Sequence, residues 1–140
     1  MNTPITYDQL LDELAHLEDA DEKCDFLIDL GMELQKLPDA EKTEQNRVQG
    51  CQSNVWMTNE LSGQTPPHVV IHAESDAMIV NGLIAALLAI YNEKTPQQIL
   101  ETDIRGTFEQ LGLFGFISPQ RRNGLFGMVE RIRQFAHASL

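Results

Sequence analysis

Cysteine is scarce in this sequence: its 140 residues include only two, Cys24 and Cys51, which lie 27 positions apart. There is no CxxC pair, whereas structural zinc sites usually combine about four ligands in paired spacings. His68 and His72 are four residues apart, but along a predicted strand that separation is roughly 13 Å, too far to share one ion. We therefore expect no disulfide framework and no metal site, and we expect the protein to work in a reducing compartment.

Long hydrophobic runs are also few. The longest covers residues 77–90 and is interrupted by Asn81 and Gly82. It is too short to span a bilayer and indicates a buried helix of the core. Residues 1–14 carry three acidic side chains and no continuous apolar stretch, so we expect no secretory signal peptide. These features predict a cytoplasmic protein that does not insert into a membrane.

Basic side chains are outnumbered, with 10 Lys and Arg against 21 Asp and Glu, for a net charge of −11. The excess lies in residues 1–44, which hold 13 acidic and 3 basic side chains. Such a surface repels phosphates, so nucleic acid and anionic membranes are not expected partners. The acidic third of the chain is either a solvated face or a docking surface for a basic protein.

The hydrophobic pattern predicts one α+β domain over residues 1–140, with a small three-stranded antiparallel sheet packed against several helices. Helical spacing and capping signals indicate helices at 7–17, 20–37, 77–91, 96–102, 105–111 and from Pro119 to at least Phe135. The expected strands lie at Val48, Val55–Leu61 and Val69–Ala73, with SGQTPP at 62–67 as a turn.

Cys51 is therefore expected in or beside a tight turn between two strands. Gly50 before it permits unusual backbone dihedrals and a close approach by a partner. Backbone amides of the turn, with Arg47, Arg121 or Arg122 nearby, would favour a thiolate. A cysteine hydrolase would need a histidine base beside the thiol, and no local motif supplies one. The residues alone leave two interpretations open: a thiol that carries a transferred group, or a small buried side chain.

The stretch NRVQGCQSNVW at 46–56 closely resembles the signature of the SufE family, which includes the CsdE branch. The resemblance extends over nearly the whole chain, through ESDA at 74–77, IVNGLI at 79–84, TPQ at 95–97, SPQR at 118–121 and GL at 124–125. It implies a sulfur acceptor of iron–sulfur cluster assembly, with a fold similar to that of the U-type cluster scaffolds. A U-type scaffold binds its cluster through several cysteines, whereas this chain has one in the matching region.

The resemblance implies two partners. A cysteine desulfurase of the SufS or CsdA type, which uses pyridoxal phosphate, would pass its persulfide sulfur to Cys51 and be stimulated in return. Cys51 would then deliver the sulfur to a cluster scaffold or another recipient. The chain itself would bind no cofactor and act as an accessory protein rather than a stand-alone enzyme. Whether it forms a homodimer is left open.

The resemblance also implies supporting roles near Cys51. Gly50 and Gln52 would form the loop that presents the thiol, Arg121 would orient the loop or supply charge, and Asp76 would pack against it. For Asp76 the residue preference itself favours a different role, the N-cap of the helix at 77–91. Cys24 is predicted to be a core residue. Two alternatives remain, a cysteine hydrolase that uses Cys51 and a protein that regulates the desulfurase by docking alone.

Overall fold

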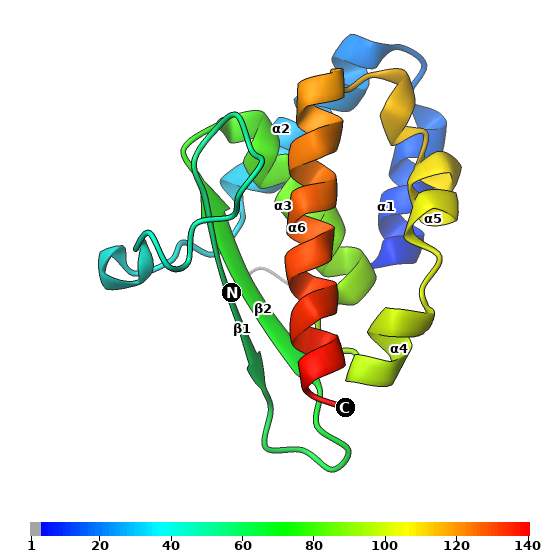
Figure 1. The fold of residues 1–140 in the computed structure, drawn as a ribbon. Coiled ribbons are helices and arrows are strands. Elements are labelled where there is room, and N and C mark those ends of the chain that lie inside the picture. The colour runs from blue at the N-terminus through cyan, green and yellow to red at the C-terminus, as the bar shows by residue number, and fades with distance from the viewer. Residues whose placement is uncertain (1–3) are drawn as a thin grey trace.

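The computed structural model describes residues 4–140 as an α+β fold, in which helices pack against a two-stranded antiparallel sheet (Figure 1). Within these residues the α-helices are α1 (Tyr7–His16), α2 (Ala20–Met32), α3 (Met78–Tyr91), α4 (Pro96–Glu101), α5 (Ile104–Leu111) and α6 (Pro119–Ala138). Two short 3-10 helices, η1 (Asp39–Glu41) and η2 (Leu113–Gly115), lie in the connections. No helix in this part of the chain is long and apolar enough to cross a bilayer.

The sheet consists of β1 (Val55–Leu61) and β2 (Val69–Ser75), paired from Val55 opposite Ser75 to Leu61 opposite Val69. Alternate residues of β2 are buried, as expected for a strand with one face on the core. The connection between the strands contains the turn predicted at 62–67, and Ser62 closes it by accepting a hydrogen bond from the His68 amide at 2.9 Å.

The predicted third strand is wrong. Beside Val48 there is one isolated bridge, in which Arg47 pairs with Trp56 of β1. The Val48 amide donates to the Val55 carbonyl at 2.8 Å, and the Met57 amide donates to the Asn46 carbonyl at 2.9 Å. The bridge cannot extend in either direction. A turn precedes it, closed by the Asn46 amide on the Thr43 carbonyl, and Gly50 follows it with a φ of 86°, which turns the chain away from the sheet.

Local capping signals set where most helices begin. Thr6 and Thr95 each form a capping box with the glutamine three residues later, and Ser118 caps α6 ahead of Pro119. The predicted second helix is too long, because α2 ends at Met32 rather than Leu37. The chain after it turns towards the sheet, where buried Leu37 donates its amide to a Glu74 carboxylate oxygen of β2 at 2.8 Å.

Two glycines bring α2 and α3 into direct backbone contact. A Cβ on Gly31 would lie 2.6 Å from the Gly82 amide nitrogen, and a Cβ on Gly82 would lie 2.1 Å from the Leu27 carbonyl oxygen. Since neither position has room for a side chain, α2 and α3 approach each other more closely here than larger residues would allow. α3 is the most buried helix of the core, and its N-terminal end faces the loop that carries Cys51.

Candidate functional site

Cys51 lies in the loop that connects the isolated bridge at Arg47 to the start of β1, and this loop rests against α6 (Figure 1). Gly50 and Gln52 on either side of it are exposed, whereas the Cys51 side chain is half-buried and packs against the hydrophobic core. The positive φ of Gly50 explains why this position favours glycine. The loop thus directs its thiol inward and its two neighbours towards solvent.

The Cys51 thiol faces the first turns of α6. Its Sγ lies 3.5 Å from the Gly124 carbonyl oxygen, to which it donates a weak hydrogen bond. Beside it is a small cavity of about 10 Å³, close to the smallest that admits one water molecule. The cavity is lined by the loop, by α3 and by α6, with Val80, Leu83, Leu125 and Met128 as its apolar residues.

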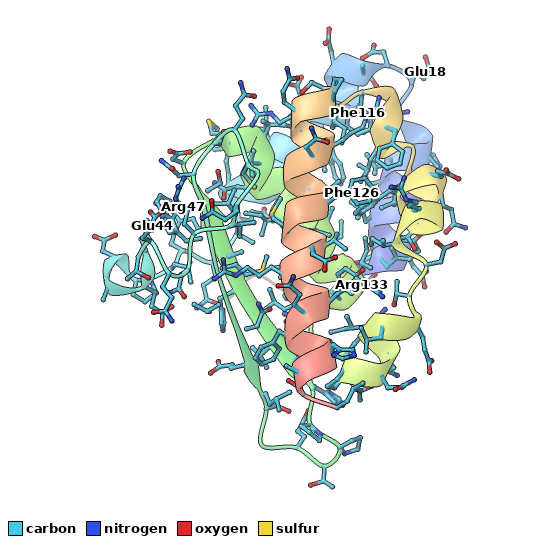
Figure 2. All side chains as sticks on the ribbon, in the orientation of Figure 1. Glu18, Glu44, Arg47, Phe116, Phe126 and Arg133 are labelled. Atoms are coloured by element: carbon cyan, nitrogen blue, oxygen red, sulfur yellow. The ribbon has the colours of Figure 1, made fainter. Side chains whose placement is uncertain are left out.

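Burial raises the pKa of the Cys51 thiol above its ordinary value, and the Arg47 guanidinium opposes this rise. Arg47 is itself held by an exposed carboxylate, since its Nη2 lies 3.0 Å from Glu44 Oε1 (Figure 2). At neutral pH the isolated protein therefore holds Cys51 mainly as the uncharged thiol. The thiolate that the loop sequence favours is not the resting state.

The predicted arginines take different positions. Arg121 reaches the loop, where its Nη1 donates to Ser53 Oγ at 3.1 Å. Arg122 points away, donating to the Phe114 carbonyl at 3.0 Å with its guanidinium over the Phe114 ring. Of the neighbouring pair it is therefore Arg121 that contacts the Cys51 loop.

Asp76 also contacts the loop, and the N-cap role predicted for it is wrong. α3 begins after Ala77, with no side-chain hydrogen bond at its cap. The Asp76 carboxylate instead accepts from the Asn54 backbone amide at 3.2 Å and from Asn54 Nδ2 at 2.9 Å. The Asp76 amide returns a hydrogen bond to the Asn54 carbonyl at 3.3 Å. Asp76 thus ties the end of the Cys51 loop to the start of α3.

The core position predicted for Cys24 is also wrong. Cys24 is half-buried on α2 and lies outside the hydrophobic cluster that Cys51 joins. Its Sγ approaches the Phe116 carbonyl at 3.9 Å. Burial raises its pKa, and the nearby carboxylates of Asp21 and Asp25 raise it further. The two thiols occupy separate surroundings, and the small cavity at the loop adjoins Cys51.

Three residues of α6 beside the loop were not predicted. Gly124 contacts Cys51, and Gly127 packs on the Gln49 carbonyl, which a Cβ there would approach to 2.8 Å. Arg131 donates from Nη1 to the Arg47 carbonyl at 2.8 Å and from Nη2 to the Gln45 carbonyl at 2.6 Å. Together with Arg121 they follow helical spacing along one face of α6. That spacing is visible in the sequence, but nothing in the sequence shows what the face contacts.

The side chains that line the cavity are apolar, amide, hydroxyl and guanidinium groups. Within the described residues none of them is a histidine, so none can serve as a general base beside Cys51. Nor do residues 4–140 contain three His, Cys, Asp or Glu side chains grouped as metal ligands would be. The site thus provides one sulfur atom, a hydrogen-bond acceptor beside it and a cavity of atomic size with apolar and polar walls.

Comparison with known proteins gives matches over nearly the whole chain. Residues 8–136 match the family model SufE, described as the Fe-S metabolism associated domain. An uncharacterized SufE-like protein of Rhizobium meliloti is 37% identical over 134 residues, which covers 95% of this chain and 96% of the relative. Another, from Rhizobium etli, is 38% identical over 130 residues, or 92% and 88% of the two chains.

The fold also matches a solved structure. The solution structure of a hypothetical protein from Thermus thermophilus superposes with a TM-score of 0.75, covering 98% of this chain and 97% of the other. At 20% identity this match concerns the fold alone. The family model and the two rhizobial relatives agree with the motifs around Cys51, and the chain belongs to the SufE family of Fe–S metabolism associated proteins.

Proposed function

We propose that this protein accepts sulfur from a cysteine desulfurase on Cys51 and passes it to a recipient in iron–sulfur cluster assembly. The observation that carries the proposal is the placement of Cys51, which is half-buried beside a cavity of about 10 Å³ while its two neighbours in the loop are exposed. Membership of a family associated with Fe–S metabolism supports it.

The proposed step is persulfide exchange. The Cys51 thiolate attacks the outer sulfur of a persulfide on the desulfurase, the donor's sulfur–sulfur bond breaks, and the donor cysteine leaves as a thiolate. One sulfur–sulfur bond forms as another breaks, so no external oxidant or reductant is consumed. Because the nucleophile is a thiolate and the leaving group is another, the step needs no histidine base, in keeping with the residues that line the cavity.

Because the pKa of Cys51 is raised in the isolated protein, the desulfurase has a role in activating the thiol. In the resting protein burial favours the neutral thiol, which is a poor nucleophile. Docking of the desulfurase draws the loop outward, which relieves that burial and leaves the Arg47 cation to favour the thiolate. Sulfur acceptance is thereby coupled to contact with the correct donor.

The cavity suits the loaded form of the protein. Val80, Leu83, Leu125 and Met128 line one part of it, and polar side chains of the loop and of α6, among them Ser53 and Arg121, line the rest. Its volume of about 10 Å³ is close to that of one added atom. Shelter of this kind slows attack on the outer sulfur by other thiols until a recipient docks.

The finer features of the proposal follow from the family. The chain binds no cofactor of its own, the pyridoxal phosphate belongs to the desulfurase, and transfer takes place in the cytoplasm. Acceptance also stimulates the desulfurase. We further propose that the fold is related to that of the U-type cluster scaffolds, from which this chain differs in offering a single cysteine at the site.

The test is sulfur loading followed by intact-mass spectrometry. Incubated with a cysteine desulfurase and cysteine, the wild type should gain the mass of one sulfur atom, and Cys51→Ser should gain none. Cys24→Ser is the matched control, because it removes the other thiol, and it should load like the wild type. Equal loading of Cys51→Ser would refute Cys51 as the acceptor. Full stimulation of the desulfurase by Cys51→Ser, with no sulfur transferred to the wild type, would show a regulator that acts by docking alone.

A further inference from the structure

The Cys51 loop lies along one face of α6, and the two run in opposite directions (Figure 1). Alternate loop residues meet successive turns of the helix. The contacts pair Gln45 and Arg47 with Arg131, Gln49 with Gly127, Cys51 with Gly124, and Ser53 with Arg121. This register decides which loop residue stands over the cavity, and a shift by two residues would replace Cys51 by Gln49 or Ser53.

The two ends of this face differ in how firmly they hold the loop. Arg131 donates two charge-assisted hydrogen bonds to backbone carbonyls, at 2.6 and 2.8 Å. Arg121 donates one bond at 3.1 Å, and its acceptor is the rotatable hydroxyl of Ser53. Between them Gly127 and Gly124 contribute close packing without any side chain. On α6 the loop is therefore held more firmly before the cysteine than after it, and beyond Ser53 it is held instead by Asp76, which accepts hydrogen bonds from Asn54.

The planar guanidinium of Arg131 is suited to holding the start of the Cys51 loop on α6. Its Nη1 and Nη2 groups point in fixed directions, so together they recognise two carbonyls at one spacing along the chain. The carbonyls of Gln45 and Arg47 are two residues apart on a segment that bridges to β1, where Arg47 pairs with Trp56. Arg131 thus fixes both the helix and the sheet relative to the residue from which the loop departs.

We propose that Arg131 is the positioning residue for Cys51: it sets the register of residues 45–53 on α6 and anchors the loop while residues 50–53, between this anchor and the Asn54–Asp76 tie, lift away. Arg131 touches neither the sulfur nor any reacting atom, and it acts through the loop backbone. The inference deepens the proposed function, on which it rests for the meaning of loop opening. The opening itself is measurable without a desulfurase.

The experiment compares the alkylation rates of the two cysteines by iodoacetamide, resolved by peptide mass spectrometry. In Arg131→Gln we expect Cys51 to react about tenfold faster than in the wild type, because two hydrogen bonds that close the loop are lost. Cys24, half-buried on α2, should keep its rate, and it reports any general loosening of the fold. Arg105→Gln is the matched control, since it removes a cation from an exposed site on α5 over the Phe126 ring.

Two outcomes would overturn the inference. One is an unchanged Cys51 rate in Arg131→Gln. The other is an equal rise at Cys24 and Cys51, which would reduce Arg131 to a general stabiliser. A conservative variant separates charge from geometry: Arg131→Lys keeps the cation but not the two fixed donors, so it should restore less than half of the lost protection. Complete restoration would refute the register argument.

Sulfur loading of the same variants separates this inference from the proposed function. If the wild type takes up sulfur and Arg131→Gln takes it up more slowly at saturating desulfurase, positioning matters for transfer. If the wild type takes up none while the alkylation rates behave as expected, the proposed function fails and the loop register stands. If loading succeeds in the wild type and is unaffected in Arg131→Gln, the positioning role is refuted and the proposed function stands.

Discussion

Replacing Gly124 by alanine should expose Cys51 without unfolding the protein. The added methyl carbon would lie 3.3 Å from Cys51 Sγ, 3.5 Å from its Cα and 3.6 Å from its Cβ. Carbon atoms pack comfortably at about 3.5–4.0 Å, and sulfur is larger, so the loop must move outward by about 0.5 Å. The neighbour that has to move is the loop that carries Cys51, because the helix is held by the core.

The stability terms of this substitution nearly cancel. Overpacking of a well-filled site costs about 1–2 kcal/mol, and alanine in place of glycine inside a helix recovers about 1 kcal/mol. The net change is within about 1 kcal/mol, which corresponds to a melting temperature within about 4 °C of the wild type. The closed loop alone bears the overpacking, so its open form should become about fivefold more populated.

The assay is the rate of Cys51 alkylation beside a thermal melt. We expect Gly124→Ala to react about fivefold faster at Cys51 and to melt near the wild type. Gly115→Ala is the matched control, since a Cβ there meets no atom within 4 Å. A wild-type alkylation rate in a folded Gly124→Ala variant would refute the reasoning that contact with Gly124 governs access to the thiol.

Three further predictions concern charge and burial. Burial raises the pKa of Cys51 above its ordinary 9.0, so the rate of Cys51 alkylation in the isolated protein should still increase with pH at pH 9. Because the Arg47 cation lowers this pKa, Arg47→Gln should shift the increase to higher pH. A rate that reaches its plateau below pH 9 in either protein would contradict these expectations. Asp76→Ala removes two hydrogen bonds to Asn54 and should speed Cys51 alkylation at a cost of about 1 kcal/mol in urea unfolding; unchanged reactivity would count against its tie to the loop. Burial raises the pKa of Tyr91 to about 12 from 10.0, so the unfolded state ionises first and the wild type should lose about 2 kcal/mol of stability as the pH rises from 10 to 12. Tyr91→Phe should lack that loss in urea titrations, and an identical pH profile would refute this.

Features that depend on neighbouring residues were predictable from the sequence. The capping threonines and Ser118 mark the starts of α1, α4 and α6, and the apolar run at 77–90 marks α3. These signals act within one helical turn, so no distant contact overrides them. The strands β1 and β2 were likewise evident from their composition and from the turn between them.

Features that depend on distant residues were not predictable. Asp76 has the residue type and position of an N-cap, but Asn54, 22 positions earlier, takes its carboxylate. The segment at Val48 has a strand-like composition, but the turn before it and Gly50 after it limit its pairing to one bridge. Cys51 is half-buried against residues far along the chain, among them Gly124, 73 positions away, and this burial raises the pKa of its thiol. The motif identified the cysteine, and only the structure shows how it is held.

Because of the glycine contact between α2 and α3, two groups of backbone amides should exchange with deuterium at different rates, one through global unfolding and one through local opening. With the Gly82 position against the Leu27 carbonyl, neither helix can shift without breaking the core, so amides at this crossing should exchange with deuterium only through global unfolding. Amides of residues 49–53 have no such constraint and should exchange through local opening, orders of magnitude sooner. The first turn of α3 should exchange slowly, and it lines the cavity beside Cys51. The α3 side of the cavity therefore stays fixed while the loop that carries Cys51 moves.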